Sequence, residues 1–385
     1  MHLLDTTLFY SPTSGGVKSY LTAKQRWFAV NSSWRHSVLV PGESTQFEAG
    51  AISTVAGWKV PGTFNYRLPL NPRAWSRAMR ILDPDCIEVG DAFHTAWVAA
   101  GHGQRHGIPV CAFYHSNLPR IIGQRYGARI ESQVRRYVRW LYSRFDVVFA
   151  PSRFMCEYLN DLGVRYTSLQ PLGVDATVFH PARRNEEART RLNLSPGTRL
   201  LVYAGRFSQE KNIEVLLRAF ARLGRRYHLL LIGGDTLARP ASNVTRIPYC
   251  RDPVELSQWL ASADALVHAG TRETFGLVIL EAMACGRPVV AARAGAIPEL
   301  VDEQVGQLAE PLDDASLAEA IDTLYSRNPA QLGLAARERV VSQFTWQRCF
   351  ERQQATYVAI TQGHAIKPMR VEAGTEVIEL RTPTS

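Results

Sequence analysis

Residues 264–291 read DALVHAGTRETFGLVILEAMACGRPVVA. The apolar run at 264–268 predicts a buried strand, and the pattern between Gly276 and Gly286 predicts a helix. Residues 288–291 predict the next strand. Strand, helix and strand in this order form a βαβ unit, which places both strands in one parallel sheet. This stretch therefore predicts an α/β fold whose ligand binds at the carboxyl ends of the strands.

The same alternation of short apolar runs and amphipathic helical stretches fills both halves of the chain. A chain of 385 residues is too long for one ordinary hydrophobic core, so we expect two domains, each with its own parallel sheet. Further strands are expected at residues 86–89, 110–114, 146–150, 199–204 and 228–232.

The boundary between the two domains is expected at residues 171–181, which contain Gly and Pro and precede a polar stretch at 183–191. The C-terminal tail is expected either to be poorly ordered or to add a strand at 377–380. The predicted parts are a first domain at 1–175 completed by a C-terminal helix at about 345–360, a second domain at 182–344, and a tail at 363–385.

The composition is that of a globular protein, with 46% hydrophobic and 21% charged residues. No apolar run approaches the roughly 18 to 20 residues that cross a bilayer, and the first residues lack the features of a signal peptide, so we expect a cytoplasmic protein. The six cysteines have no metal-binding spacing and are predicted to be reduced core thiols. The net charge of +9 predicts an anionic partner, which leaves nucleotide phosphates, acidic lipid and nucleic acid open.

The start of the helix that follows residue 275 predicts a phosphate site. The backbone N–H groups of Phe275, Gly276 and Leu277 have no partner inside the helix and face the crevice at the strand ends. Glu273 enters the same crevice from the loop, and Glu281 lies in the second turn of the helix. Two carboxylates at different depths suit a ligand with hydroxyl groups at two places, although each alone is equally compatible with a solvated surface charge.

A second motif, AGRFSQEKN at residues 204–212, follows another predicted strand. Gly205 allows close approach to the backbone, while Arg206 and Lys211 bring two positive charges to the same sheet edge. Such charges can neutralise a departing diphosphate without a metal ion. Alone, the pair would more often be a basic surface turn.

Two weaker signals lie in the first half of the chain. Gly15 and Gly16 follow the N-terminal strand and precede an amphipathic helix, a pattern that also serves ordinary turns. His115 follows the strand expected at 110–114, where residues of a cleft belong, although a lone histidine is more often structural.

In this order, these elements resemble the retaining, two-lobed GT-B glycosyltransferases of family four, in which two Rossmann-like domains face each other across a cleft. The most specific element is the E-x7-E motif from Glu273 to Glu281. The sequences VGDAFHT and FYHSNLP look most like the GDP-mannose-dependent mannosyltransferases. The other matching elements are GRFSQEKN at 205–212, PLGVDATVFHP at 171–181, SGGV at 14–17 and PVCAFYHS at 109–116, so that the resemblance covers about residues 1–360.

The resemblance implies catalytic roles for His115, Arg206, Lys211 and Glu273. Arg206 and Lys211 would bind the donor diphosphate beside the amides at the helix start, and Glu273 would bind hydroxyls of the transferred sugar. His115 would contact the sugar near the reacting carbon, and Glu281 would accept hydrogen bonds from the ribose.

The resemblance also implies roles around the rest of the cleft. Gly15 and Gly16 would let the first lobe touch the donor phosphate, the base would bind around Tyr249, and Asp91 would line the acceptor side. Gln209 stands where many members have proline, which concerns the shape of the loop.

The expected reaction is metal-independent, retaining transfer of a hexose from a nucleotide sugar to a lipid, polyol or saccharide acceptor, with mannose favoured. The donor would be GDP-mannose or a UDP-sugar, with no further cofactor. A sugar-nucleotide epimerase or a phosphorylase could use the same fold, and a nucleic-acid-binding protein would also explain the charge.

Two further features are open to more than one interpretation. Asp83 and Asp85 spell the D-x-D metal signature of a different transferase fold, but their place before a strand favours a plain connection. Residues 120–144 are basic and aromatic, and one continuous helix would place four arginines on one face. One interpretation is that this face binds an acidic membrane surface or an acceptor phosphate at the cytoplasmic side of the bilayer. The other is that it is a solvated helix face. The four residues are Arg125, Arg129, Arg136 and Arg139.

Overall fold

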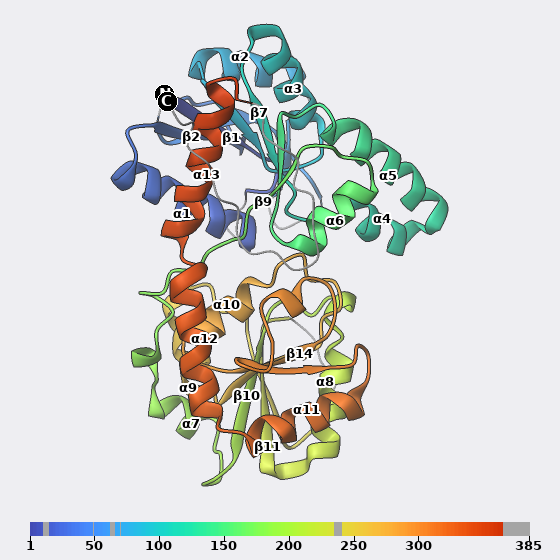
Figure 1. The fold of residues 1–385 in the computed structure, drawn as a ribbon, viewed down its shortest axis with the longest axis vertical. Coiled ribbons are helices and arrows are strands. Elements are labelled where there is room, and N and C mark those ends of the chain that lie inside the picture. The colour runs from blue at the N-terminus through green and yellow to red at the C-terminus, as the bar shows by residue number, and fades with distance from the viewer. Residues whose placement is uncertain (11–14, 49, 62–65, 70, 235–240, 365–385) are drawn as a thin grey trace, which may run out of the picture.

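The computed structural model describes residues 1–10, 15–48, 50–61, 66–69, 71–234 and 241–364. Two α/β lobes lie end to end, the first at the top of Figure 1 and the second at the bottom. Ser14 and the strand proposed at 377–380 lie outside the described residues.

The first lobe contains a seven-stranded parallel sheet in the order β3-β2-β1-β6-β7-β8-β9. A short antiparallel pair, β4 (Trp58–Lys59) and β5 (Arg67–Leu68), lies outside the sheet. The sheet strands are β1 (His2–Thr6), β2 (Arg35–Gly42), β3 (Ile52–Ala56), β6 (Cys86–Val89), β7 (Val110–Phe113), β8 (Val147–Ala150) and β9 (Thr167–Leu169). The helices are α1 (Gly16–Asn31), α2 (Pro72–Leu82), α3 (His94–His106), α4 (Leu118–Tyr126), α5 (Ala128–Tyr142) and α6 (Arg153–Asp161).

The second lobe contains a six-stranded parallel sheet in the order β12-β11-β10-β13-β14-β15. Its strands are β10 (Arg199–Ala204), β11 (Tyr227–Ile232), β12 (Val244–Ile247), β13 (Ala265–His268), β14 (Val289–Ala292) and β15 (Gly306–Ala309). The helices after the first lobe are α7 (Glu186–Arg191), α8 (Ile213–Leu223), α9 (Pro253–Ser262), α10 (Leu277–Ala284), α11 (Asp314–Ser326), α12 (Pro329–Gln343) and α13 (Trp346–Thr361). The predicted α/β fold with parallel sheets is confirmed.

In each sheet the strand order reverses next to the first strand of the lobe. The reversal lies between β1 and β6 in the first lobe and between β10 and β13 in the second. The loops that leave these strands at their carboxyl ends diverge to opposite faces of the sheet and leave a crevice there. The motifs at 205–212 and 269–276 follow β10 and β13, so both lie at this crevice.

Helix α13 returns from the second lobe and packs beside α1 of the first (Figure 1). The chain therefore passes between the lobes twice, and the two passages meet where Val174 pairs with Thr345 in a parallel bridge. The N–H of Val174 donates to the carbonyl of Phe344 at 2.8 Å. Two adjacent passages held by backbone pairing are the arrangement expected of a hinge.

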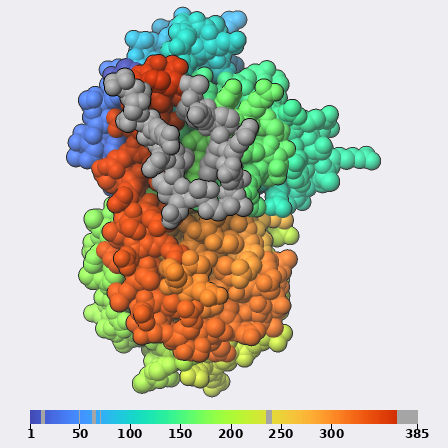
Figure 2. Space-filling model, in the orientation of Figure 1, coloured from blue at the N-terminus to red at the C-terminus, as the bar shows by residue number. Residues whose placement is uncertain are grey.

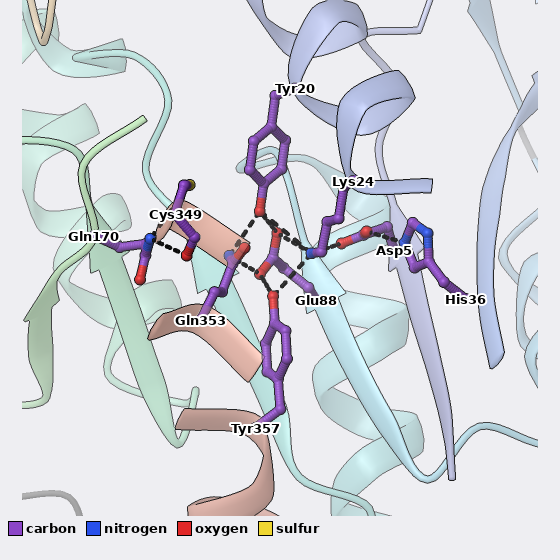
Figure 3. Close-up of polar contacts among 9 residues, drawn as sticks. All are labelled: Asp5, Tyr20, Lys24, His36, Glu88, Gln170, Cys349, Gln353 and Tyr357. Carbon is purple, nitrogen blue, oxygen red and sulfur yellow. Dashed lines mark hydrogen bonds and ion pairs between the residues drawn. The ribbon is translucent and has the colours of Figure 1, made fainter. Parts of the chain in front are cut away.

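A buried polar network attaches α13 to the first lobe (Figure 3). Lys24, fully buried on α1, forms ion pairs at 3.0 Å with Asp5 on β1 and with Glu88 on β6. From α13, the amide of Gln353 donates to Glu88 Oε2 at 2.8 Å, and the hydroxyl of Tyr357 accepts from Lys24 at 2.8 Å. Burial raises the pKa of Glu88 to about 7 despite Lys24. Because a buried charge requires partners, removing α13 would leave this network incomplete.

All six cysteines are free and buried, as predicted. The single helix considered for residues 120–144 is wrong: Gly127, with φ 89°, separates α4 from α5, which pack against each other. Arg125 therefore lies on α4, while Arg129, Arg136 and Arg139 lie on α5. Within the described part of the chain, no helix combines the length and the apolarity needed to cross a membrane.

Candidate active site

The two loops at the crevice of the second lobe are joined by hydrogen bonds. The side-chain amide of Asn212 donates to the carbonyl of Ala269 at 2.9 Å, and the N–H of Thr271 donates to the carbonyl of Glu210 at 3.1 Å. Asn212 adopts a left-handed conformation with φ 52°, which asparagine tolerates better than most residues. These bonds bring Lys211 from one loop to Glu273 from the other.

Lys211, Glu273 and His268 form the polar centre of the site. Lys211 Nζ pairs with Glu273 Oε1, and His268 Nε2 lies 3.0 Å from the same oxygen. The Nδ1 atom of His268 accepts from the N–H of Gly270 at 3.2 Å, so the ring carries a proton on Nε2 and donates it to Glu273. The crevice at the strand ends, where both residues were expected, therefore brings Lys211 and Glu273 into contact, and His268 is a further member that was not among the predicted site residues.

The charge state of Glu273 follows from these contacts. Burial alone would raise the pKa of Glu273, but the hydrogen bond from His268 and the charge and hydrogen bond of Lys211 outweigh it and hold the pKa well below its usual range. The carboxylate is thus ionised, and its side chain is only 13% exposed. A fixed, ionised carboxylate with one oxygen already occupied can accept hydrogen bonds from a ligand on the other.

Helix α10 begins directly after this carboxylate. Gly276 precedes the helix with φ 105°, a conformation that favours glycine, and a Cβ there would lie 3.1 Å from the side chain of Ile279. Among the described residues, no hydrogen bond uses the N–H groups of Phe275, Gly276 or Leu277. Free amides at a helix start attract anions, and this start follows Glu273, the ion-pair partner of Lys211, in the chain.

Deeper in the same helix, Glu281 is half-buried, and burial raises its pKa to about 7. No hydrogen bond from another described side chain reaches its carboxyl group. The Tyr249 side chain is 52% exposed; burial of its hydroxyl and the charge of Glu281 raise its pKa, whereas Arg206 opposes the change. The charges of Glu281 and Arg206 thus both act on the Tyr249 hydroxyl. Arg206 itself is exposed and has no ion pair in the described part of the structure.

His115 follows β7, and its backbone carbonyl accepts from Thr274 Oγ1 of the second lobe at 3.2 Å. Its ring stacks on Phe113 with centroids 4.3 Å apart and meets Tyr20 edge-on at 5.2 Å. Burial, and secondly the charge of Lys24, lower the pKa of His115 to about 3, so the ring is neutral near pH 7.

The two glycines of the first lobe differ in their surroundings. A Cβ added to Gly16 would lie 3.2 Å from Leu277 Cδ1, so this position touches the start of α10 in the other lobe. Gly15, at the N-terminus of α1, has open space around it. Gly205, with φ 152°, follows β10, and its N–H donates to the carbonyl of Ile232 at 2.9 Å.

Asp91 is buried, and its carboxyl group is occupied within the protein. It accepts from the N–H of Leu8 at 2.7 Å, from the N–H of Phe93 at 2.8 Å and from the hydroxyl of Thr95 at 3.1 Å. Burial raises its pKa although these bonds oppose the change. Asp91 thus fixes the loops after β1 and β6, and its contribution to the acceptor side stays a prediction.

The D-x-D sequence lies at the opposite edge of the first sheet. Asp83 ends α2, and Asp85 accepts from the N–H of His2 at 2.6 Å, immediately before β6 begins. The sequence thus lies in the connection between α2 and β6, and its lack of a metal role stays a prediction. Among the described residues, no three His, Cys, Asp or Glu side chains gather as a group that could bind a metal ion.

Comparisons with known proteins give the context of this site. Residues 198–327 match the family described as Glycosyl transferases group 1, and residues 14–178 match Glycosyltransferase Family 4. The chain is 32% identical over 377 residues to the GDP-mannose-dependent alpha-(1-6)-phosphatidylinositol dimannoside mannosyltransferase of Mycobacterium tuberculosis, covering 94% of this chain and 97% of the relative. The chain belongs to the family 4 glycosyltransferases. It is therefore an enzyme of the hexosyltransferase class.

Solved structures of other glycosyltransferases share the fold. Sucrose-phosphate synthase from Thermosynechococcus elongatus superposes with a TM-score of 0.78 at 22% identity, covering 94% of this chain and 99% of that one. Anabaena HepE, solved with UDP-glucose, gives 0.73 at 20% identity, covering 93% and 100%. The fold of this family 4 glycosyltransferase is thus the GT-B fold.

Proposed function

We propose that this enzyme transfers a hexose, with mannose favoured, from a nucleoside diphosphate sugar to a lipid, polyol or saccharide acceptor, with retention of configuration and without a metal ion. The observation that carries the proposal is the Lys211–Glu273–His268 cluster beside the free amides of α10. Lys211 and the α10 amides suit a diphosphate, and the Glu273 carboxylate suits the hydroxyls of the attached sugar.

In the proposed reaction, the bond between the sugar and the diphosphate breaks through an oxocarbenium-like state while negative charge grows on the leaving group. Arg206, Lys211 and the α10 amides stabilise that charge. Glu273 orients the sugar. The oxygen of the acceptor hydroxyl attacks the anomeric carbon on the face from which the diphosphate leaves, and the leaving phosphate accepts the proton of that hydroxyl. The proposed contribution of His115, from the first lobe, is that of a neutral ring, which adds no charge near the reacting carbon. We nominate no covalent nucleophile.

The preference for mannose rests on the relative from M. tuberculosis, whose name specifies GDP-mannose as donor and a phosphatidylinositol dimannoside as acceptor. The HepE structure contains UDP-glucose, so the fold accepts another base and sugar. In this chain, the half-exposed Tyr249 next to Glu281 is the proposed contact region for base and ribose.

A panel of GDP-, UDP- and ADP-sugars tests both the donor and the absence of a metal. We expect the purified protein to release sugar from GDP-mannose faster than from the other donors, at equal rates with excess EDTA and with added Mg²⁺ or Mn²⁺, because the two cations neutralise the diphosphate. Chromatographic measurement of the released nucleoside diphosphate gives the rates. A strict requirement for manganese, or no turnover of any nucleotide sugar, would refute the proposal.

For the acceptor, we propose that the α4–α5 hairpin binds an acidic membrane surface. The hairpin projects from the side of the first lobe, as Figures 1 and 2 show. Four of its arginines are exposed and have no ion pair with a described acidic residue. They are Arg125, Arg129, Arg136 and Arg139. Nearby, Trp97 and Trp140 are 49% and 47% exposed, with ring centroids 6.3 Å apart. Exposed tryptophans beside arginines are typical of surfaces that lie in the headgroup region.

Liposome flotation tests this surface. We expect the protein to float with vesicles containing phosphatidylinositol or phosphatidylglycerol and not with pure phosphatidylcholine, because each arginine near an acidic surface adds about 1 kcal/mol. Replacing Arg129 and Arg136 by glutamine should reduce binding about thirtyfold, because two such contributions amount to about 2 kcal/mol. The matched control, Arg225→Gln with Arg226→Gln, removes the same charge from exposed positions of the second lobe and should bind normally. Equal flotation of the two double variants, or flotation that does not depend on acidic lipid, would refute membrane binding by the α4–α5 hairpin.

A further inference from the structure

The loop that carries Glu273 is bonded directly to the first lobe. Thr274 Oγ1 donates to the carbonyl of His115 at 3.2 Å. Ser152 Oγ, at the start of α6, donates in turn to the carbonyl of Thr274 at 2.8 Å. Thr274 is therefore bonded twice across the cleft, and its neighbour in sequence is the carboxylate proposed to bind the sugar.

A second contact across the cleft lies at the N-terminus of α6. The two carboxylate oxygens of Glu299, in the second lobe, accept from the N–H groups of Arg153 and Phe154 at 2.8 Å each. Ser152 Oγ accepts from the N–H of the next residue, Met155, at 3.2 Å. The first free amides of this first-lobe helix are thus satisfied partly by a carboxylate from the other lobe, which also suits the helix dipole.

The two contacts belong to one unit of the second lobe. The N–H of Ala296 donates to the carbonyl of Glu273 at 3.0 Å, and Gly295 lies so close that a Cβ there would be 2.6 Å from the same carbonyl oxygen. The loop after β14, which carries Glu299, therefore supports the backbone of the loop that carries Glu273. A movement of either loop away from the first lobe would alter both sets of bonds.

We propose that Thr274, Ser152 and Glu299 are positioning residues that form an interlobe clasp and hold His115 at a fixed distance from Glu273 across the bound hexose. The location of the hexose rests on the proposed function, whereas the clasp rests on the contacts themselves. None of the three needs to touch the reacting atoms. They act by fixing the positions of the groups that contact the reacting atoms. Small displacements of such groups lower reaction rates strongly.

Thr274→Val tests the clasp because valine has nearly the shape of threonine but cannot donate to His115. We expect turnover of GDP-mannose to fall about tenfold, while GDP binding by calorimetry changes less than about twofold, since the diphosphate groups are untouched. Thr274→Ser keeps the hydroxyl and should restore turnover. The control Thr190→Val makes the same change on α7 of the second lobe, away from the cleft, and should behave as wild type.

A readout that needs no activity separates the clasp from the proposed function. Spin labels at Gln104→Cys and Arg225→Cys, exposed positions on opposite lobes, report the distribution of distances between the lobes. We expect Thr274→Val and Glu299→Ala to broaden this distribution relative to wild type and Thr274→Ser. Unchanged distributions and turnover in both variants would overturn the clasp. A broadened distribution in a protein that turns over no nucleotide sugar would support the clasp and refute the proposed function.

Discussion

Replacing Lys211 by alanine is expected to lower the rate of hexose transfer by about two to three orders of magnitude, the usual effect of removing one group that stabilises a developing charge. The side chain of Lys211 is only 19% exposed and pairs with Glu273, so water screens its charge weakly. Its loss removes a charge that acts on the leaving diphosphate, and it also leaves the Glu273 carboxylate with His268 as its one remaining side-chain partner among the residues that the structure describes. We expect kcat to fall more than KM rises, because leaving-group charge is greatest in the transition state.

Stability measurements show whether this effect is catalytic. Removing one partner of a largely buried carboxylate should lower the free energy of unfolding by about 1 to 3 kcal/mol, which leaves the protein folded at 25 °C. Arg206→Ala should reduce transfer in the same way without loss of stability, because Arg206 is exposed. Arg226→Ala, an exposed change in the same lobe, is the control and should be fully active. A near-normal rate in the double variant Arg206→Ala with Lys211→Ala would refute the roles proposed for both residues.

Replacing Glu281 by glutamine is expected to weaken nucleotide-sugar binding at pH 8 by about tenfold or more, because an ionised carboxylate accepts stronger hydrogen bonds from ribose hydroxyls than an amide does. Burial raises the pKa of Glu281 to about 7. As the pH falls from 8 to 6, the wild-type carboxylate becomes protonated, so affinity for the donor should decrease across this window. In Glu281→Gln this part of the pH dependence should disappear, as calorimetry at pH 6, 7 and 8 would report.

The same substitution should stabilise the free enzyme at high pH. The pKa of Glu281 is higher in the folded state than the ordinary value of 4.5, so its contribution to stability is present below pH 4.5 and is lost as the pH rises through about 7. Glu281→Gln should therefore unfold at a higher temperature than wild type at pH 8 in the absence of nucleotide. Glu303→Gln, at an exposed position of the same lobe, is the control. An unchanged pH slope of donor affinity in Glu281→Gln would contradict the assignment.

Much of the fold could be predicted because parallel strands are buried on both faces and read as continuous apolar runs. The strand expected at 110–114 ends one residue earlier, at Phe113, which is within the usual uncertainty of element ends. The pairing of Lys211 with Glu273 could also be predicted from the sequence, because both residues follow strands whose carboxyl ends share one sheet edge. Local sequence was sufficient for these features.

Other features depend on neighbours that the sequence does not reveal. His268 ends an apolar strand, and no local pattern indicates that its ring turns towards Glu273. Lys24 lies on the apolar face of α1, but its partner Tyr357 is 333 residues away. The bonds of Thr274 to the first lobe require the positions of both lobes. The break in the basic segment could have been predicted from Gly127, because glycine commonly ends helices.

The central claim is that the diphosphate of a nucleotide sugar binds between Arg206, Lys211 and the first amides of α10. A crystal structure of the enzyme with GDP-mannose tests it most directly. We expect the diphosphate within hydrogen-bonding distance of both cations and of the Phe275 to Leu277 amides, with the mannose against Glu273 and the ribose against Glu281. A nucleotide sugar bound anywhere else, or with these side chains turned away from it, would contradict the account.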